Sequence, residues 1–369
     1  MIKVLSIFGT RPEAIKMAPV VRELQRFPDR ISSVVCVTAQ HRQMLDQALS
    51  LFGIVPEHDL NIMLPDQSLA ELTSNTLVKL DRVLREEQPD WVLVQGDTTT
   101  AMVGALAAFY RRIRVGHVEA GLRTWDRFAP FPEEINRRIA DGVCDLHFAP
   151  TAAARENLLR EGVAEAGIHV TGNTVIDALL DVAAREYDWA GGELAGVPRD
   201  RRLILVTAHR RENFGAPLLA LCDSLRRIAA QYDDVHVVYP VHLNPHVYGP
   251  VHEQLRGIPN LTLLEPLDYL PLVQLMKACF LVLTDSGGLQ EEAPGLGKPV
   301  LVVRDVTERP EGVAAGTVKM VGADPDRIFG EAARLLDDPA EYLRMARAVN
   351  PYGDGHASPR IVSRLLASS

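Results

Sequence analysis

The chain has 369 residues, which is too long for one typical hydrophobic core, so we expect two domains. Hydrophobic residues make up 47% and charged residues 24% of the sequence, a composition that supports packed cores and excludes a largely disordered chain. The formal net charge of -9 argues against a nucleic-acid-binding protein.

No stretch of the sequence indicates export or membrane insertion. The apolar start reaches Gly9-Thr10-Arg11-Pro12 too early for a secretory signal, and no run approaches the roughly 18 apolar residues of a membrane span. The four cysteines lie far apart without a C-x-x-C pair, which favours free thiols in a reducing compartment. We therefore expect a soluble cytoplasmic protein without a nucleic-acid or membrane partner.

Short β-rich runs alternate with longer helical patterns from the N-terminus onward, as in parallel-sheet α/β proteins. In the first half, helices are predicted at residues 12–27 and 70–87. Strands are predicted at residues 3–8, 33–38, 91–95, 115–118 and 147–149. We assign residues 1–172 to an N-terminal Rossmann-like domain.

The alternation restarts at residue 202, after a connection at residues 186–198 that contains three glycines and a proline. Residues 173–356 are assigned to a C-terminal Rossmann-like domain, and a final helix at residues 357–369 is expected to pack back on the first domain. The predicted fold class is α/β, with two doubly wound domains facing a cleft that is the default active site. Strands of the second domain are predicted at residues 202–207, 235–239, 261–264, 280–284 and 300–303.

The stretch Leu283–Glu292 has the pattern of a buried strand that breaks into a two-glycine turn and opens a helix. Gly287 and Gly288 let backbone N–H groups approach a phosphate, and the helix start after Ser286 adds partial positive charge. Glu292 lies about one turn further on, where a carboxylate can hold a ribose diol. The stretch therefore predicts a nucleoside diphosphate site, although an ordinary strand-to-helix turn has the same pattern.

Charged residues also follow the predicted strands of the first domain. Arg11 and Lys16 begin the helix after the first strand, where they suit a diphosphate or serve as solvated charges of a capped helix. Asp97 follows another strand and either caps the next helix or contacts a ligand. Glu119 ends a buried strand and needs a partner, either Arg123 or a substrate hydroxyl.

Three further candidates have structural alternatives. Glu133 begins a helix, where the macrodipole alone explains an acidic residue. His209 follows the first strand of the second domain beside two arginines, and either neutralises phosphate charge or packs. Arg309 lies on the loop after the last predicted strand, as a phosphate or base contact or as a plain loop charge.

Missing motifs exclude several cofactor chemistries. The sequence has no G-x-G-x-x-G after a strand, no P-loop and no H-E-x-x-H. His242 and His246 are four residues apart, but Pro245 interrupts any helix between them, which argues against a metal site. We expect neither a metal nor a cofactor.

Seven motifs stand in order along the chain: Gly9-Thr10-Arg11-Pro12-Glu13, Gln95-Gly96-Asp97, His117-Val118-Glu119-Ala120-Gly121, Pro132-Glu133-Glu134, Thr171-Gly172-Asn173, His209-Arg210-Arg211-Glu212, and Ser286-Gly287-Gly288 with Glu292. Together they resemble the non-hydrolysing UDP-N-acetylglucosamine 2-epimerase family over nearly the whole sequence. The resemblance implies an isomerase with the two-domain GT-B fold, a homodimer, and interconversion of UDP-GlcNAc and UDP-ManNAc.

The same resemblance assigns roles to the candidate residues. Asp97, Glu119, Glu133 and His209 fall on catalytic positions, and Arg11 and Lys16 on positions around the sugar and diphosphate. Leu267 and Leu272 stand near the uracil where the family often has glutamine and phenylalanine, which is a departure from the pattern. The UDP-binding positions are Ser286, Gly287, Gly288, Glu292 and Arg309.

Many bacterial members of the family also bind a second UDP-GlcNAc as an activator. The residues that resemble this second site are Gln40, His41, Gln43 and His242. Asp66 occupies a place where some members have arginine, which departs from the activator pattern.

The implied reaction is anti elimination of UDP to a 2-acetamidoglucal intermediate, followed by proton return on the other face and re-addition of UDP. It requires groups that stabilise the departing diphosphate, together with acids and bases on two faces of the sugar. The alternative interpretations are a GT-B glycosyltransferase, a hydrolysing relative that releases ManNAc and UDP, and a non-catalytic nucleotide-sugar sensor.

Overall fold

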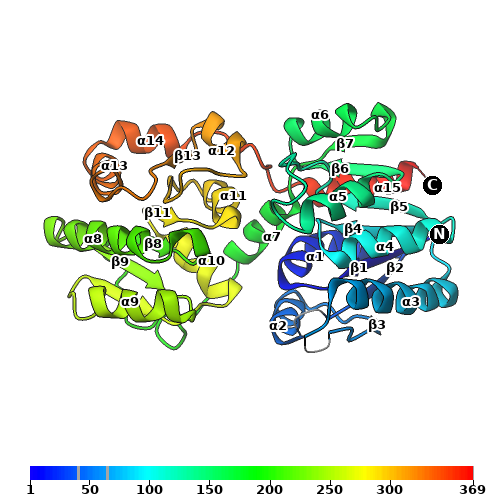
Figure 1. The fold of residues 1–369 in the computed structure, drawn as a ribbon, viewed down its shortest axis with the longest axis horizontal. Coiled ribbons are helices and arrows are strands. Elements are labelled where there is room, and N and C mark those ends of the chain that lie inside the picture. The colour runs from blue at the N-terminus through cyan, green and yellow to red at the C-terminus, as the bar shows by residue number, and fades with distance from the viewer. Residues whose placement is uncertain (40–41, 64–65, 369) are drawn as a thin grey trace. The chain divides into compact units, whose positions relative to one another are not determined.

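A computed structural model describes residues 1–39, 42–63 and 66–368 of the chain. The chain divides into two compact units, Met1–Ala178 with Tyr352–Ser369, and Leu179–Pro351. Each unit contains one parallel β-sheet with helices on both faces (Figure 1). The predicted fold class, α/β with two Rossmann-like doubly wound domains as in GT-B proteins, is confirmed.

The first unit has a seven-stranded sheet in the order β3-β2-β1-β4-β5-β6-β7. Its central strands are almost entirely buried, as expected for parallel strands covered by helices on both faces. The strands are β1 (Ile2–Phe8), β2 (Ile31–Val37), β3 (His58–Asp59), β4 (Trp91–Gln95), β5 (Arg114–Val118), β6 (Leu146–Ala149) and β7 (Ile168–Val170). The helices are α1 (Arg11–Gln25), α2 (Arg42–Phe52), α3 (Leu69–Glu87), α4 (Thr99–Tyr110), α5 (Glu133–Asp141), α6 (Ala152–Arg160), the 3-10 helix η1 (Glu165–Gly167) and α15 (Ala357–Ala367). Helix α7 (Thr174–Ala183) begins in this unit and continues into the second.

The second unit has a six-stranded sheet in the order β10-β9-β8-β11-β12-β13. Its strands are β8 (Arg202–Thr207), β9 (Val235–Pro240), β10 (Leu261–Leu264), β11 (Leu281–Thr284), β12 (Val300–Val302) and β13 (Val318–Met320). The helices are the 3-10 helix η2 (Arg211–Asn213), α8 (Ala216–Gln231), α9 (Pro245–Leu255), α10 (Tyr269–Ala278), α11 (Gly287–Gly295), α12 (Pro310–Ala315), α13 (Pro325–Asp337) and α14 (Pro339–Ala346).

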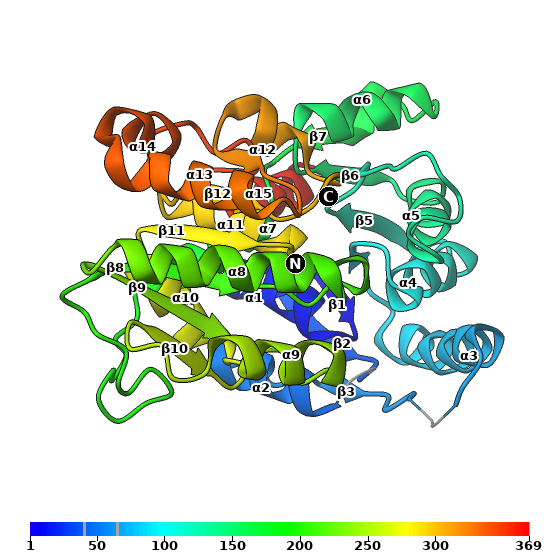
Figure 2. The same cartoon turned by 60° about the vertical axis from the view of Figure 1, so that its left-hand side comes forward.

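Helix rows cover both faces of each sheet. In the first unit, α3, α4 and α5 pack side by side, and α1 packs against both α2 and α15. In the second unit, α8 contacts α9 and α13, while α11 contacts β11 and β12 (Figure 2). The helices thus shield the strands from water and leave the strand ends to carry polar groups.

Most predicted elements are observed, with ends shifted by one or two residues. The strands at residues 91–95, 202–207 and 261–264 have the predicted bounds. The short strands β3, β7 and β13 were not predicted, because two or three residues are too few to establish a pattern. The final helix ends at Ala367.

The boundaries of the two units differ from those assigned from the sequence. Residues 173–178 belong to the first unit, because Asn173 and Asp177 bond within it. The backbone N–H of Asn173 donates to Tyr352 O at 2.6 Å. The carboxylate of Asp177 accepts the backbone N–H groups of Ala357 and Ser358 at the start of α15.

Candidate active site

In each unit, predicted site residues follow the two strands between which the strand order reverses. In a doubly wound sheet, ligands bind beyond the carboxyl ends of the strands at this switch point. In the first unit, the reversal lies between β1 and β4, which lead into Arg11 and Asp97. In the second unit it lies between β8 and β11, which lead into His209 and Ser286.

Glu119 is the centre of the polar cluster in the first unit. It follows β5 directly, is 5% exposed, and has a φ of 65°, a left-handed conformation that is strained for a residue with a side chain. Its Oε2 pairs with Lys16 Nζ and accepts a hydrogen bond from Asn173 Nδ2 at 3.0 Å. The carboxylate is thereby held in one orientation.

Asp97 joins this cluster through Arg137 of α5. A guanidinium nitrogen of Arg137 donates to Asp97 Oδ2 at 2.5 Å and lies 3.4 Å from Glu119 Oε1. Arg137 also donates to the backbone carbonyl of Glu119. The side chain of Asp97 is 34% exposed, whereas that of Glu119 is 4% exposed. Asp97 is therefore the carboxylate of this pair that water or a ligand reaches more easily.

Asp97 does not cap the following helix, which was one of its two predicted roles. Thr98 is the N-cap of α4, with its Oγ1 accepting the N–H of Ala101 at 3.1 Å. The adjacent threonine already satisfies the helix start, so the Asp97 carboxylate remains for Arg137.

Glu133 and Glu134 are neighbours with different surroundings. Glu134 is 4% exposed and accepts hydrogen bonds from the backbone N–H groups of Thr124 and Trp125, which anchors the loop before α5. Glu133 is partly exposed and lies one helical turn before Arg137, on the same side of α5. Of the two acids, Glu133 is the one available for a ligand.

His209 and Asp285 form a pair in the second unit. Nδ1 of His209 lies 3.2 Å from Asp285 Oδ1, and the backbone N–H groups of His209 and Arg210 donate to Oδ2 at 2.8 Å. Asn213 Nδ2 adds a third bond at 3.0 Å. The imidazole is 42% exposed, while the carboxylate is fully buried. Asp285 thus holds the backbone at His209 and places a buried carboxylate beside an accessible imidazole.

Burial opposes the charge of Asp285, but hydrogen bonds from His209 and the Arg210 backbone outweigh this cost and hold the pKa of Asp285 below its ordinary value. A depressed pKa adds stability above the unfolded-state pKa of about 3.9, and this stability is lost as the pH falls through the folded-state pKa.

We therefore expect Asp285→Asn to melt below the wild type at pH 7, with a difference that shrinks as the pH falls below about 4. Differential scanning fluorimetry across pH 3 to 7 measures this difference. Asp223→Asn is the control, because Asp223 is an exposed residue of α8, and it is expected to show almost no difference. A gap for Asp285→Asn that stays constant down to pH 3 would contradict the assigned charge.

The start of α11 has the features of an anion site. Ser286 is its N-cap but makes no side-chain capping bond, so the first N–H groups of the helix are not covered by this residue. A Cβ on Gly287 or Gly288 would meet protein atoms only at 3.6 Å, and neither glycine has a positive φ. The surrounding protein therefore does not require glycine at these two positions. Glycine there leaves the backbone open to close approach by a ligand.

Glu292 lies on the following turn of α11 and is 6% exposed. Its Oε1 accepts a hydrogen bond from the hydroxyl of Tyr269 at 2.5 Å. Tyr269 begins α10 and is itself buried. The tyrosine thus orients the carboxylate that the sequence assigned to a ribose.

The remaining predicted UDP contacts are placed near these groups along the chain. Arg309 pairs with buried Glu291, the residue before Glu292. Leu267 precedes α10 and Leu272 lies on it, and both side chains are partly exposed. In the first unit, Arg11 is the first residue of α1 and is partly exposed.

The residues predicted for a second, activating ligand are only partly described. Gln40 and His41 lie outside the described residues. Gln43 is exposed on α2 of the first unit. His242 lies in the second unit, where its ring stacks on that of His209 with centroids 5.6 Å apart.

The chain matches the family model described as UDP-N-acetylglucosamine 2-epimerase over residues 22–366. UDP-N-acetylglucosamine 2-epimerase of Escherichia coli K12 is 56% identical over 369 residues, covering 98% of each chain. This chain belongs to the UDP-N-acetylglucosamine 2-epimerase family.

Solved structures of the family agree with this assignment. A structure from Listeria monocytogenes is 49% identical, with a TM-score of 0.94 over 100% of this chain and 96% of that one. UDP-GlcNAc 2-epimerase of Neisseria meningitidis, solved with UDP-GlcNAc bound, is 50% identical, with a TM-score of 0.88 over 99% and 100% of the chains. The predicted membership of the epimerase family is confirmed.

In each unit, the structure adds residues to the candidate site to which the sequence analysis assigned no role. Arg137 and Asn173 contact Glu119, while Asp285 and Tyr269 orient His209 and Glu292. Two of them were visible as signals, because Arg137 is one helical turn from Glu133 and Asp285 directly precedes Ser286. Asn173 belongs to the Thr171-Gly172-Asn173 motif, but the sequence did not indicate its partner, and it gave no signal for Tyr269, because both contacts are long-range.

One predicted partner of Glu119 is wrong. Arg123 does not pair with Glu119 but with Asp141 and Glu161, at 2.6 and 2.5 Å. The competing acids at the end of α5 and just after α6 occupy its guanidinium. Lys16 and Arg137 take the place that was expected for Arg123.

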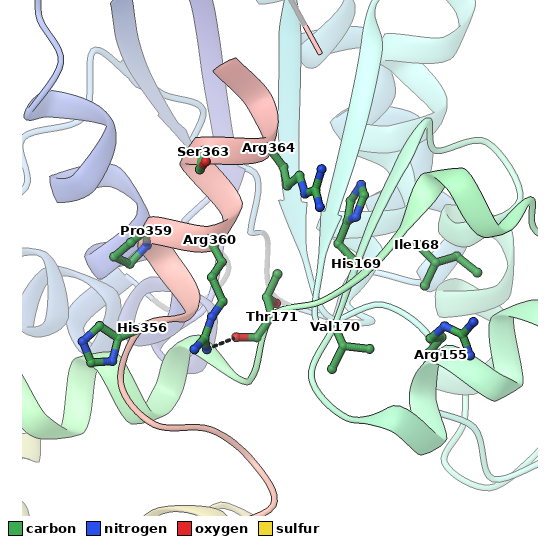
Figure 3. Close-up of a pocket in the computed structure, with 10 residues that line it drawn as sticks. All are labelled: Arg155, Ile168, His169, Val170, Thr171, His356, Pro359, Arg360, Ser363 and Arg364. Atoms are coloured by element: carbon green, nitrogen blue, oxygen red, sulfur yellow. Dashed lines mark hydrogen bonds between the residues drawn. The ribbon is translucent and has the colours of Figure 1, made fainter. Parts of the chain in front are cut away.

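A cavity of about 560 Å³ in the first unit, between β7 and α15, contains none of the predicted epimerase residues (Figure 3). Its arginines are largely engaged in the fold. Arg360 donates to Thr171 O at 3.0 Å and pairs with Asp354, and Arg155 pairs with Glu165. We do not assign a ligand to this cavity.

Two negative findings apply to the described part of the chain. No group of three or more His, Cys, Asp or Glu side chains there is arranged to hold a metal ion. None of the helices found there combines the length and the hydropathy needed to cross a membrane. His246, which lies four residues after His242 in the spacing discussed for a metal site, packs its ring on Phe214.

Proposed function

We propose that the protein interconverts UDP-GlcNAc and UDP-ManNAc by inverting carbon 2 of the sugar. The observation that carries the proposal is the polar cluster of Asp97, Glu119, Lys16 and Arg137 beyond the switch point of the first sheet, in a member of this family. The bound UDP-GlcNAc of the Neisseria relative supports the choice of substrate.

The chemistry at carbon 2 requires elimination. No carbonyl group conjugates with carbon 2, so its proton is not acidic and direct removal would face a very high barrier. When UDP leaves carbon 1 as the carbon 2 proton departs from the opposite face, the sugar becomes a 2-acetamidoglucal. A proton then returns to the other face of carbon 2, and UDP adds back to carbon 1.

We propose that cationic and dipolar groups stabilise the departing diphosphate. The start of α11 at Ser286-Gly287-Gly288 provides backbone N–H groups and a helix dipole, and His209, held by Asp285, provides an oriented imidazole. Arg11 and Lys16 provide positive charge in the first unit. Groups of this kind act most strongly where negative charge develops, which here is the leaving UDP.

The exposure of the Asp97, Glu119 and Glu133 side chains suggests which of them transfer protons. Glu119 is buried and held by Lys16 and Arg137, so we assign it an orienting and electrostatic role. Asp97 and Glu133 are more accessible, and we assign the removal and return of the proton to them.

Product analysis tests this function directly. Purified protein incubated with UDP-GlcNAc alone is expected to yield UDP-ManNAc by proton NMR. Free ManNAc with UDP would indicate a hydrolysing enzyme. No reaction until an acceptor is added would indicate a glycosyltransferase. Binding without any reaction would indicate a nucleotide-sugar sensor.

The contact between Tyr269 and Glu292 gives a prediction for UDP affinity. Tyr269→Phe removes a hydrogen bond to a buried carboxylate and is expected to weaken UDP binding about 10-fold, because such a bond contributes about 1.5 kcal/mol. Isothermal titration calorimetry with UDP measures the change. Tyr248→Phe, which loses a 3.4 Å contact to exposed Glu265, is the control and should bind like the wild type. If the wild type and both variants bind UDP with equal affinity, Glu292 is not part of the UDP site.

We further propose that the protein is a cytoplasmic homodimer and that a second UDP-GlcNAc activates it. The four free cysteines support a reducing compartment. The stacking of His242 on His209 supports activation, because a ligand that contacts His242 would also fix the catalytic imidazole.

A further inference from the structure

His117 is a fully buried histidine in the middle of the first unit's site, two residues before Glu119 on β5. Both of its ring nitrogens lie against oxygen atoms. Nδ1 is 2.6 Å from Asp141 Oδ1, and Nε2 is 2.7 Å from the backbone carbonyl oxygen of Gly96. At these distances each contact is a full hydrogen bond.

A neutral imidazole cannot make both bonds, because it has only one N–H group. The Gly96 carbonyl never donates. The Asp141 carboxylate also accepts hydrogen bonds from Arg123 at 2.6 Å and from the Gly121 N–H at 3.2 Å. The ion pair with Arg123 favours the charged form of this carboxylate, so Asp141 accepts and does not donate. Both nitrogens of His117 must therefore donate, which makes it an imidazolium ion.

The two acceptors belong to the elements that carry the proposed acids. The Gly96 carbonyl is part of the peptide that leads into Asp97, at a turn where Gly96 has a φ of 73°. Asp141 is the last residue of α5, the helix that also carries Glu133. His117 itself lies on the strand that leads into Glu119. One buried cation thus connects the three backbone segments.

We propose that His117 is a positioning residue of the epimerase site: a buried imidazolium that fixes the backbone segments of Asp97, Glu119 and Glu133 relative to one another. This inference rests on the proposed function. It assigns a role to the histidine of the His117-Val118-Glu119 motif. The side chain of this histidine bonds to Asp141 and to the Gly96 carbonyl, not to the three proposed catalytic acids.

The neighbouring strand offers a matched control. His147 of β6 pairs in register with His117, is also buried, and makes a single hydrogen bond to the backbone oxygen of Asp141 at 2.8 Å. It has no bond to the peptide of Gly96. His147→Gln therefore changes the same residue type at similar depth without touching the Asp97 turn.

Kinetics of the two variants test the positioning role. His117→Gln is expected to lower kcat for UDP-GlcNAc about 100-fold, because a shift of roughly 1 Å at a reacting group costs on the order of 100-fold, while KM changes little. His147→Gln should keep kcat within about threefold of the wild type when compared at temperatures where both are folded. Equal losses of kcat in the two variants, or a loss confined to KM, would overturn the proposal.

The protonation state has its own test, which does not depend on activity. Long-range ¹H–¹⁵N NMR of histidine-labelled protein should show a buried ring with two N–H groups. That signal should be absent from His117→Gln and present in His147→Gln. If His117→Gln does not fold, the wild-type and His147→Gln spectra still decide the state. A spectrum without a doubly protonated ring would overturn the inference, whereas failure of the wild type to form UDP-ManNAc would overturn the proposed function.

Discussion

Replacing Asp97 by asparagine is expected to lower kcat for epimerisation about 1,000-fold, while the Kd for UDP stays within about twofold. The amide keeps the shape of the side chain but cannot accept a proton. Positioned carboxylates that transfer protons contribute roughly 100- to 10,000-fold to rates. Asp97 is the more exposed acid of the Arg137 pair, so we expect it to carry a full contribution of this kind.

Asp81→Asn is the matched control for this variant. Asp81 is a surface residue of α3 that pairs with Arg111, so its replacement should leave kcat unchanged. Steady-state rates from a coupled assay, together with UDP titration calorimetry, separate proton transfer from binding. An Asp97→Asn protein that keeps more than about a tenth of the wild-type kcat would remove Asp97 from the proton transfers.

Arg137→Met is expected to lower both stability and activity by large amounts. Arg137 is 4% exposed and lies between two carboxylates, and removal of one partner from a buried ion pair costs about 3–5 kcal/mol of unfolding free energy. Methionine has a similar length but leaves Asp97 and Glu119 without their shared cation. The melting temperature should fall, and kcat should fall about 100-fold because both acids lose their orientation.

Two further variants sharpen the Arg137 experiment. Arg138→Met removes the adjacent arginine, which is exposed and pairs with Glu161, so it should cost little. Arg137→Lys keeps the positive charge but cannot donate from two nitrogens at once, to the Asp97 carboxylate and to the backbone carbonyl of Glu119. It should fold and melt closer to the wild type, yet lose activity. Wild-type stability and rate in Arg137→Met would contradict the assigned geometry.

The fold was largely predictable from local sequence patterns. Strands such as 91–95 and 202–207 are continuous apolar runs, and buried parallel strands have this pattern wherever helices cover both faces of the sheet. The motifs at the strand ends could be found for the same reason, because a polar residue directly after such a run has few structural explanations. Glu119 is the clearest case.

Side-chain partners were less predictable because they depend on contacts between distant segments. Arg123 is four residues from Glu119 in sequence, yet Asp141 at the end of α5 and Glu161 just after α6 bind it. Local competition also matters, since Thr98 caps α4 and thereby leaves the Asp97 carboxylate for Arg137. Only the folded structure separates Glu133, which remains accessible, from Glu134, which anchors a loop.

The exchange of hydrogen at carbon 2 distinguishes elimination from every route that leaves that bond intact. In the proposed reaction the proton taken from carbon 2 mixes with solvent before another returns, because the carboxylate that holds it is partly exposed. The experiment requires UDP-GlcNAc, the wild-type protein and heavy water, with the product examined by proton NMR and mass spectrometry.

The account predicts UDP-ManNAc with deuterium at carbon 2 and a mass increase of one unit. UDP-ManNAc that retains its original hydrogen at carbon 2 would contradict it.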